Sequence, residues 1–137
     1  MELLILAALG LYLVQTLLPP AFRYFLRPDA DLSVPMGPRD NPPETSVYGA
    51  RSERAHANMQ EALLIFLPLA LLLNARPEIP AMGLLGAQIF VIARLIYLPA
   101  YITGIPVVRS LVWTVGLVAL FLMAGAVAGS FMGASAA

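Results

Sequence analysis

The sequence predicts an all-α integral membrane protein, a four-helix bundle that forms a single domain over residues 1–137. Of these residues, 60% are hydrophobic and 12% are charged, which is about half the charge of a typical soluble domain. Four apolar segments, with their polar extensions, each supply the roughly 20 residues that cross the hydrocarbon core of a bilayer. These segments and their links use up the chain, so we expect no separate aqueous domain.

The first span is expected at about residues 2–26. No basic segment precedes its apolar run and no small-x-small cleavage site follows it, so we expect a retained membrane helix rather than a signal peptide. Pro19 and Pro20 interrupt helical hydrogen bonding, so the helix either kinks there or completes its crossing before Arg23. Arg23 and Arg27 lie one turn apart, and they either anchor this end among lipid headgroups or reach a ligand site.

The first connection, residues 28–48, contains five prolines and Gly37, a composition typical of a loop. We expect it to cover the mouth of the bundle. Arg76 is the one arginine of the second connection, whereas five lie between the first and second apolar segments. The positive-inside rule therefore places the first connection in the cytoplasm and both termini outside. All eight basic residues are arginine, which indicates a GC-rich genome and favours a bacterial inner membrane.

The second span is expected at about residues 49–74, and its first half carries polar side chains to membrane depth. At about 100° per residue, four of them fall within roughly one quarter of the helix circumference, namely Arg51, Arg54, Asn58 and Glu61. Ionisable groups at this depth cost roughly 2.5–3.5 kcal/mol each, so this stripe needs partners. It predicts either a bound polar ligand or Arg–Glu pairs that serve the structure alone.

The third span, expected at about residues 80–101, carries a second polar stripe formed by Arg94, Tyr97 and Tyr101. Their spacings of three and four place them within about 60° of one another. Tyrosines near the end of a span usually belong to the interfacial aromatic belt. Arg94 on the same face favours a functional site instead.

The fourth span is expected at about residues 106–131, with Pro106 at its start. Arg109 and Ser110 lie in its first turn, where a cation gains nothing from the helix dipole. We therefore expect another interaction to hold Arg109 there. The rest of the span is mostly apolar and rich in small residues.

Cysteine is absent from the chain, which excludes disulfides, thiolate metal ligands and a protein thiol nucleophile. Any sulfur chemistry must therefore come from a cosubstrate. We expect no metal site and no nucleic-acid partner.

Two motifs carry a resemblance to a known family. Arg54-Ala-His-Ala-Asn-Met-Gln-Glu61 resembles the signature of the MAPEG family, membrane-associated proteins in eicosanoid and glutathione metabolism, in which Asn and Glu follow an Arg-Ala pair at four and seven residues after the Arg. Arg94-Leu-Ile-Tyr-Leu-Pro-Ala-Tyr101, followed by Arg109-Ser110, resembles the family's third-helix tyrosines and fourth-helix arginine. The resemblance covers the whole chain in span number, length and motif order.

The resemblance implies a homotrimer of four-helix protomers, with glutathione bound between neighbouring subunits near the cytoplasmic side. It implies that Arg109 stabilises the glutathione thiolate and that Tyr97 and Tyr101 donate hydroxyl groups. It leaves open whether Arg23 or Arg27 supplies a first-helix arginine. The expected catalytic residues are Arg109 and Tyr101, and the expected glutathione-binding residues are Arg23, Arg51, Arg54, Asn58, Glu61, Arg94, Tyr97, Tyr101, Arg109 and Ser110.

The expected function is that of a glutathione-dependent transferase or peroxidase acting on lipophilic electrophiles from the bilayer. Ala57, Met59 and Gln60 depart from residues common in the family, and these departures leave the electrophile open. The main alternative is a non-catalytic lipid-binding or scaffold protein with the same fold. A small transporter or channel that conducts along the Arg/Glu stripe is a third reading.

Overall fold

The protein is described by a computed structural model that covers residues 1–28, 30, 36–37 and 42–134, with side chains described as far as residue 129. All secondary-structure elements of the described residues are helices. They are α1 Glu2–Pro20, the π-helical turn η1 Ala21–Phe25, α2 Val47–Asn74, α3 Ala81–Thr103 and α4 Pro106–Ala134. Four helical segments are long and apolar enough to cross a membrane, the first being α1 together with η1. The prediction of an all-α protein with four membrane-spanning helices is confirmed.

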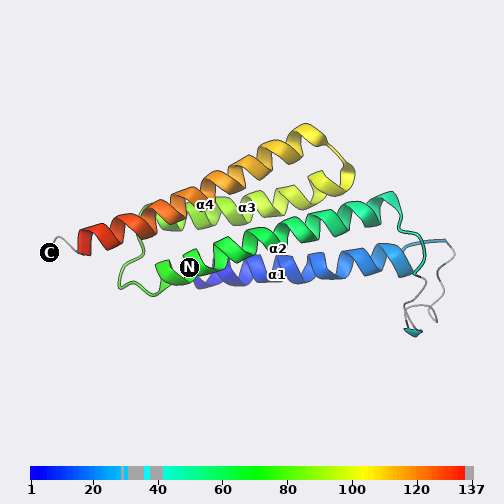
Figure 1. Ribbon diagram of the computed structural model, residues 1–137, viewed down its shortest axis with the longest axis horizontal. Coiled ribbons are helices and arrows are strands. Elements are labelled where there is room, and N and C mark those ends of the chain that lie inside the picture. Colours follow the sequence, from blue (N-terminus) through cyan, green and yellow to red (C-terminus); the bar gives the residue numbers. More distant parts are fainter. Residues whose placement is uncertain (29, 31–35, 38–41, 135–137) are drawn as a thin grey trace.

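The four helices lie side by side along one axis, with α1 beside α2 and α3 beside α4 (Figure 1). The turn between α3 and α4 lies at the same end of the bundle as the start of α2 (Figure 1). Within the predicted loop over residues 28–48, residues 29, 31–35 and 38–41 lie outside the described residues, so the expected covering of the bundle mouth is not described. The arrangement brings the polar first half of α2 level with the second half of α3 and the start of α4.

The core is formed mainly between α2, α3 and α4. Phe66 of α2 and Phe90 of α3 are both fully buried and stack with ring centroids 4.4 Å apart and planes 9° apart. Close packing between α3 and α4 depends on Gly86, because a Cβ atom there would lie 2.9 Å from the carbonyl oxygen of Ala119. Small residues of this kind let membrane helices approach closely.

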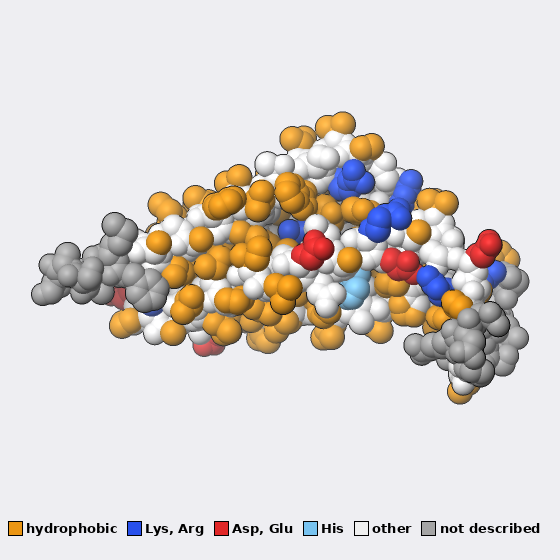
Figure 2. All heavy atoms as spheres, viewed as in Figure 1, with side chains coloured by type: hydrophobic (Ala, Val, Ile, Leu, Met, Phe, Trp, Pro, Cys, Tyr) orange, Lys and Arg blue, Asp and Glu red, His pale blue; other side chains and the backbone are white. Residues whose placement is uncertain are grey.

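The outer surface carries many large apolar side chains, of which Leu3, Leu64 and Phe121 are 81%, 73% and 69% exposed. A continuous apolar surface is unfavourable in water but matches the acyl chains of a bilayer. Figure 2 shows that hydrophobic side chains cover one half of the bundle, whereas arginine and acidic side chains gather towards the end that holds the α3–α4 turn. The protein therefore places its polar chemistry near one face of the membrane.

The end of α1 continues through Pro19 and Pro20 as helix and then widens into η1. In η1 the backbone N–H of Leu26 donates to the carbonyl oxygen of Ala21 at 2.8 Å, an i to i+5 bond. The two prolines do not end the helical course, so Arg23 lies inside a helical segment.

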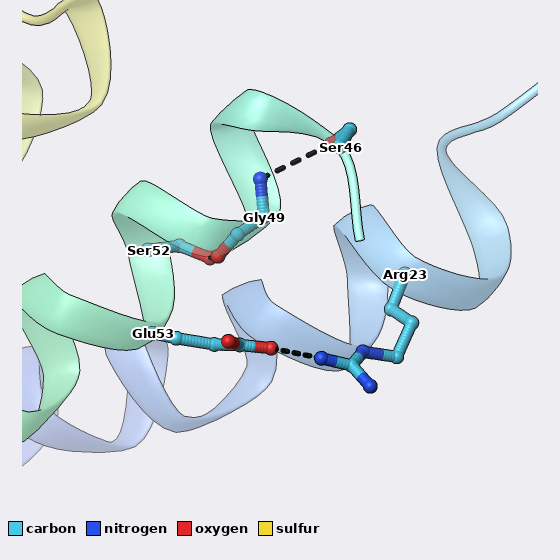
Figure 3. Close-up of polar contacts among 5 residues, drawn as sticks. All are labelled: Arg23, Ser46, Gly49, Ser52 and Glu53. Carbon is cyan, nitrogen blue, oxygen red and sulfur yellow. Dashed lines mark hydrogen bonds and ion pairs between the residues drawn. The ribbon is translucent and has the colours of Figure 1, made fainter. Parts of the chain in front are cut away.

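Helix α2 begins at Val47, two residues before the expected start, because Ser46 provides an N-cap. The Ser46 hydroxyl oxygen accepts a hydrogen bond from the backbone N–H of Gly49 at 3.1 Å (Figure 3). This bond satisfies one of the backbone N–H groups that a helix start leaves unpaired. The cap fixes where the polar face of α2 begins.

Candidate functional site

Arg94 of α3 and Asn58 of α2 form the central contact of the site. The Nη1 atom of Arg94 donates to the Oδ1 atom of Asn58 at 2.7 Å. Arg94 is only 4% exposed, and Asn58 is half-buried. Hydrogen bonds from a charged donor are shorter and stronger than those between neutral groups. This bond joins the two polar stripes that the sequence predicts on the second and third spans.

The Arg94 guanidinium is also held by aromatic rings of its own helix. Its Cζ atom lies 5.1 Å from the centroid of the Phe90 ring and 5.3 Å from that of Tyr97, within the range of cation–π attraction. Its Nε atom is buried and has no hydrogen-bond partner among the described residues. Because buried polar groups almost always have a partner, this unpaired N–H is an exception.

A pocket of about 140 Å³ opens beside the Arg94–Asn58 pair. Glu61 on its wall is exposed, and it makes no hydrogen bond or ion pair within the described part of the chain. The polar wall therefore presents an amide, a guanidinium and one carboxylate that has no partner among the described residues. The lining residues are Asn58, Glu61, Ala62, Ile65, Arg94, Trp113, Leu117 and Leu120.

A second pocket, of about 390 Å³, lies along the start of α4. Trp113 lines this pocket as well as the first one. The two pockets therefore share one lining side chain, that of Trp113. The residues that line the second pocket are Tyr97, Arg109, Ser110, Trp113 and Thr114.

Arg109 contacts an aromatic ring. From its unfavourable position in the first turn of a helix we expected some interaction to hold it there. Its Cζ atom lies 5.1 Å from the centroid of the Tyr101 ring, and the Tyr101 and Tyr97 rings are 5.4 Å apart. Across the described residues, Arg109 has no carboxylate partner. Its charge is therefore not neutralised by the protein at the edge of the second pocket.

Arg51 lies at the end of α3 rather than in either pocket. Its Nη1 atom donates to the carbonyl oxygen of Ile102 at 3.0 Å, and a cation at a helix C-terminus is favoured by the helix dipole. Gly104 caps α3 with φ of 80°, and a Cβ atom there would lie 2.5 Å from the Arg51 Cζ atom. Arg51 thus holds the turn that leads to Arg109.

Arg54 and Arg23 are not brought to either pocket within one protomer. The Arg54 side chain is exposed and has no hydrogen-bond or ion-pair partner among residues 42–129. Arg23 pairs with Glu53, which projects from α2 on the side away from Asn58, at 2.5 Å (Figure 3). The protomer therefore groups Asn58, Glu61 and Arg94 with the first pocket, and Tyr97, Arg109 and Ser110 with the second.

Trp113 is a site residue that the motifs did not identify. It is 41% exposed and lies one helical turn after Arg109, so both side chains project from the same face of α4. This i, i+4 relation to a suspected site arginine was the signal present in the sequence. A large aromatic side chain in a membrane span is otherwise unremarkable, because such residues are common near the interface.

Comparison with known proteins supports the interpretation of the motifs. The model of the MAPEG family matches residues 2–129. The comparisons with curated proteins and with solved structures gave no match. The family model covers nearly the whole described chain, including α1, α2, α3, the part of α4 up to residue 129, and every residue that lines the two pockets. The protein therefore belongs to the MAPEG family, and is a multi-pass membrane protein related to eicosanoid and glutathione metabolism.

Proposed function

We propose that the protein is a glutathione-dependent transferase or peroxidase that acts on lipophilic electrophiles. The observation that carries this proposal is a pair of pockets that are both lined by Trp113, one next to Arg94, Asn58 and Glu61 and the other next to Arg109. The first pocket offers polar groups that suit a charged peptide. The second pocket is lined by Arg109, whose charge has no carboxylate partner among the described residues.

The polar groups fit glutathione by their chemistry. Glutathione has two carboxylates, one ammonium group and one thiol, so its site needs several donors, one anion and a cation near sulfur. The Asn58 amide supplies donors, and guanidinium groups suit carboxylates. Glu61 supplies the anion for the ammonium group. The fit thus uses Glu61, which has no partner among the described residues.

Glutathione, when bound, supplies the thiol that reacts with the electrophile. Arg109 keeps its charge at any relevant pH, and a nearby guanidinium lowers the pKa of a thiol from its usual value of about 8.5. The Tyr101 ring orients the guanidinium, and the Tyr101 hydroxyl is a second candidate donor to sulfur. The role proposed for Arg109 is therefore to favour the thiolate.

We further propose that the active unit is a homotrimer that binds glutathione between neighbouring copies. Arg54 is exposed and has no partner among the described residues, which is consistent with a ligand shared with a neighbouring copy. A first-helix arginine, Arg23 or Arg27, would reach the site of a neighbouring copy. We also propose a bacterial inner membrane location with the site facing the cytoplasm, because arginines concentrate around the first connection.

The proposed function is tested by titrating the purified protein with glutathione. Because Trp113 is the single tryptophan of the chain, its fluorescence should change as the adjoining pockets fill, and calorimetry should give the same affinity. Absorbance should reveal bound thiolate, which S-methylglutathione cannot form. Turnover with a lipophilic aryl halide or a lipid hydroperoxide would then separate transferase from peroxidase. If glutathione neither binds nor ionises, the proposal is wrong.

A second candidate function is lipid binding without catalysis. It is favoured by an apolar groove of about 360 Å³ between α1 and α2, which is lined by Leu9, Tyr12, Gln60, Leu63, Leu64, Leu67 and Pro68. Such a groove matches an acyl chain. This candidate predicts that a spin-labelled fatty acid binds with or without glutathione, while no glutathione binding or turnover is detected. Glutathione binding with turnover would favour the transferase or peroxidase.

A further inference from the structure

The chemistry of the Arg94–Asn58 contact determines the orientation of the Asn58 amide, that is, which of its oxygen and nitrogen atoms faces Arg94. A guanidinium has five N–H donors and no acceptor, so the atom that lies 2.7 Å from Arg94 Nη1 must be the amide oxygen. The reversed amide would place N–H groups against N–H groups and lose the bond. The Nδ2 atom, with its two N–H donors, therefore lies on the side away from the Arg94 Nη1 atom.

Arg94 is itself restrained, so it can impose this orientation. It is 4% exposed, it lies against the Phe90 and Tyr97 rings, and its Nη2 atom lies 3.6 Å from where a Cβ atom of Gly116 would be. The guanidinium is thus flanked by two rings of α3 and lies near the backbone of α4 at Gly116. Asn58, in contrast, is half-buried and lines the first pocket together with exposed Glu61.

We propose that Arg94 is a positioning residue, which holds Asn58 so that the amide N–H groups, and not the amide oxygen, are presented to the ligand. The inference rests on the proposed function, because the ligand is glutathione. It divides the first pocket into a donor at Asn58 and an acceptor at Glu61. The ligand group that binds Asn58 must then be an acceptor, a carboxylate or an amide carbonyl, and the group that binds Glu61 must be a donor.

A double-mutant cycle on glutathione affinity tests this assignment. Arg94→Met removes the restraint and Asn58→Ala removes the amide, and each should weaken glutathione binding about tenfold. If Arg94 acts through Asn58, the double variant should also bind about tenfold more weakly, because the restraint has nothing left to orient. A loss near one hundredfold, the product of the two, would mean that Arg94 binds the ligand itself and would overturn the proposal.

Asn58→Asp gives a second test that does not depend on removing the buried arginine. It keeps the size of the side chain and an oxygen for Arg94, but it replaces the N–H donors with a carboxylate oxygen. Glutathione affinity should fall by about thirtyfold or more, with a raised KM and a kcat within about threefold at saturating glutathione, because Arg109 is unchanged. Unchanged affinity would show that no donor is needed there, and would overturn the proposal.

The control is Ile92→Ala, a substitution of an exposed residue on the same helix as Arg94, which should leave the affinity and the kcat unchanged. Failure of the proposed function is distinguishable from failure of this inference. If the parent protein binds no glutathione, both are overturned. If the parent binds glutathione and the two single losses multiply in the double variant, the positioning role alone is overturned.

Discussion

The two polar sides of α2 use charge in different ways. On the side towards α1, Glu53 pairs with Arg23, and the His56 ring stacks on the Tyr12 ring at 5.0 Å. On the side towards α3, Arg94 meets the neutral amide of Asn58, and Glu61 has no cationic partner among the described residues. On the side towards α1 the two charges neutralise each other. On the side towards α3, Arg94 and Glu61 each lack a counter-charge among the described residues.

This difference indicates what each side is for. A partly exposed ion pair such as Arg23–Glu53 contributes at most about 1 kcal/mol and serves local structure. An arginine that is almost fully buried without a counter-charge is unfavourable in a membrane, so it is retained where a ligand or a neighbouring subunit completes it. Substitutions on the α3 side should therefore alter function, and those on the α1 side should alter stability slightly.

The largest effect is expected from Arg109→Leu. Without the guanidinium the pKa of the bound thiol should rise, and turnover with a lipophilic electrophile should fall about ten- to a thousandfold, a loss of roughly 1.4–4 kcal/mol of transition-state stabilisation. Much of the glutathione affinity should remain, because Asn58, Glu61 and Arg94 are unchanged. Stopped-flow absorbance of the thiolate and steady-state kinetics would measure both quantities.

Tyr101→Phe is the matched variant for Arg109→Leu, because it keeps the ring that supports Arg109 and removes the hydroxyl. We expect it to retain most of the activity. Normal turnover by Arg109→Leu together with an inactive Tyr101→Phe would transfer the activating role to Tyr101.

Glu61→Ala should have the next largest effect. It leaves the ligand ammonium group without a counter-charge, which costs about 1–3 kcal/mol, or roughly five- to a hundredfold in glutathione affinity. Calorimetry measures the loss directly. Binding as tight as that of the parent would show that Glu61 does not contact glutathione and would weaken the contrast between the two sides of α2.

Gly104→Ala should destabilise the turn between α3 and α4. A side chain at φ of 80° costs about 1–2 kcal/mol, and its Cβ atom would displace the Arg51 guanidinium from the α3 terminus. We expect a lower melting temperature in detergent together with reduced turnover, because the same turn leads to Arg109. Unchanged stability and turnover would show that the Arg51 contact does not position the site.

The smallest effects are expected on the α1 side of α2. Glu53→Gln and Arg23→Gln should each lower the free energy of unfolding by less than about 1 kcal/mol, measured by denaturant titration in detergent. Glu53→Gln should leave glutathione affinity unchanged. An affinity loss confined to Arg23→Gln would assign Arg23, rather than Arg27, to the site of a neighbouring copy.

The sequence predicted the helices better than it predicted which contacts and pockets each polar residue belongs to. Four spans and two polar stripes follow from composition and helical period, since these patterns depend on one helix at a time. The stripe on α2 extends over about 15 Å along the helix axis from Arg51 to Glu61, which is too long for one contact. Arg51 therefore meets the end of α3, whereas Asn58 meets Arg94.

Contacts between helices could not be predicted from the period of a single helix. The pairing of Arg23 with Glu53 and the place of Trp113 between two pockets depend on which helices are neighbours and at what height they face each other. The family resemblance supplied expected ligand residues but not these contacts. The structure divides the residues that the resemblance grouped as one site into two pockets, with Tyr101 beside Arg109 and three arginines, Arg23, Arg51 and Arg54, outside both pockets.

The widened turn η1 explains why the spacing of Arg23 and Arg27 left their roles open. A π-helical turn arises when one extra residue is accommodated in an α-helix, and it rotates everything that follows by about 100° relative to an uninterrupted helix. Helical periodicity counted from the apolar face of α1 therefore misplaces side chains after Ala21. A substitution or deletion that converted η1 to regular α-helix would turn Arg23 and the residues after it towards a different neighbour without breaking the span.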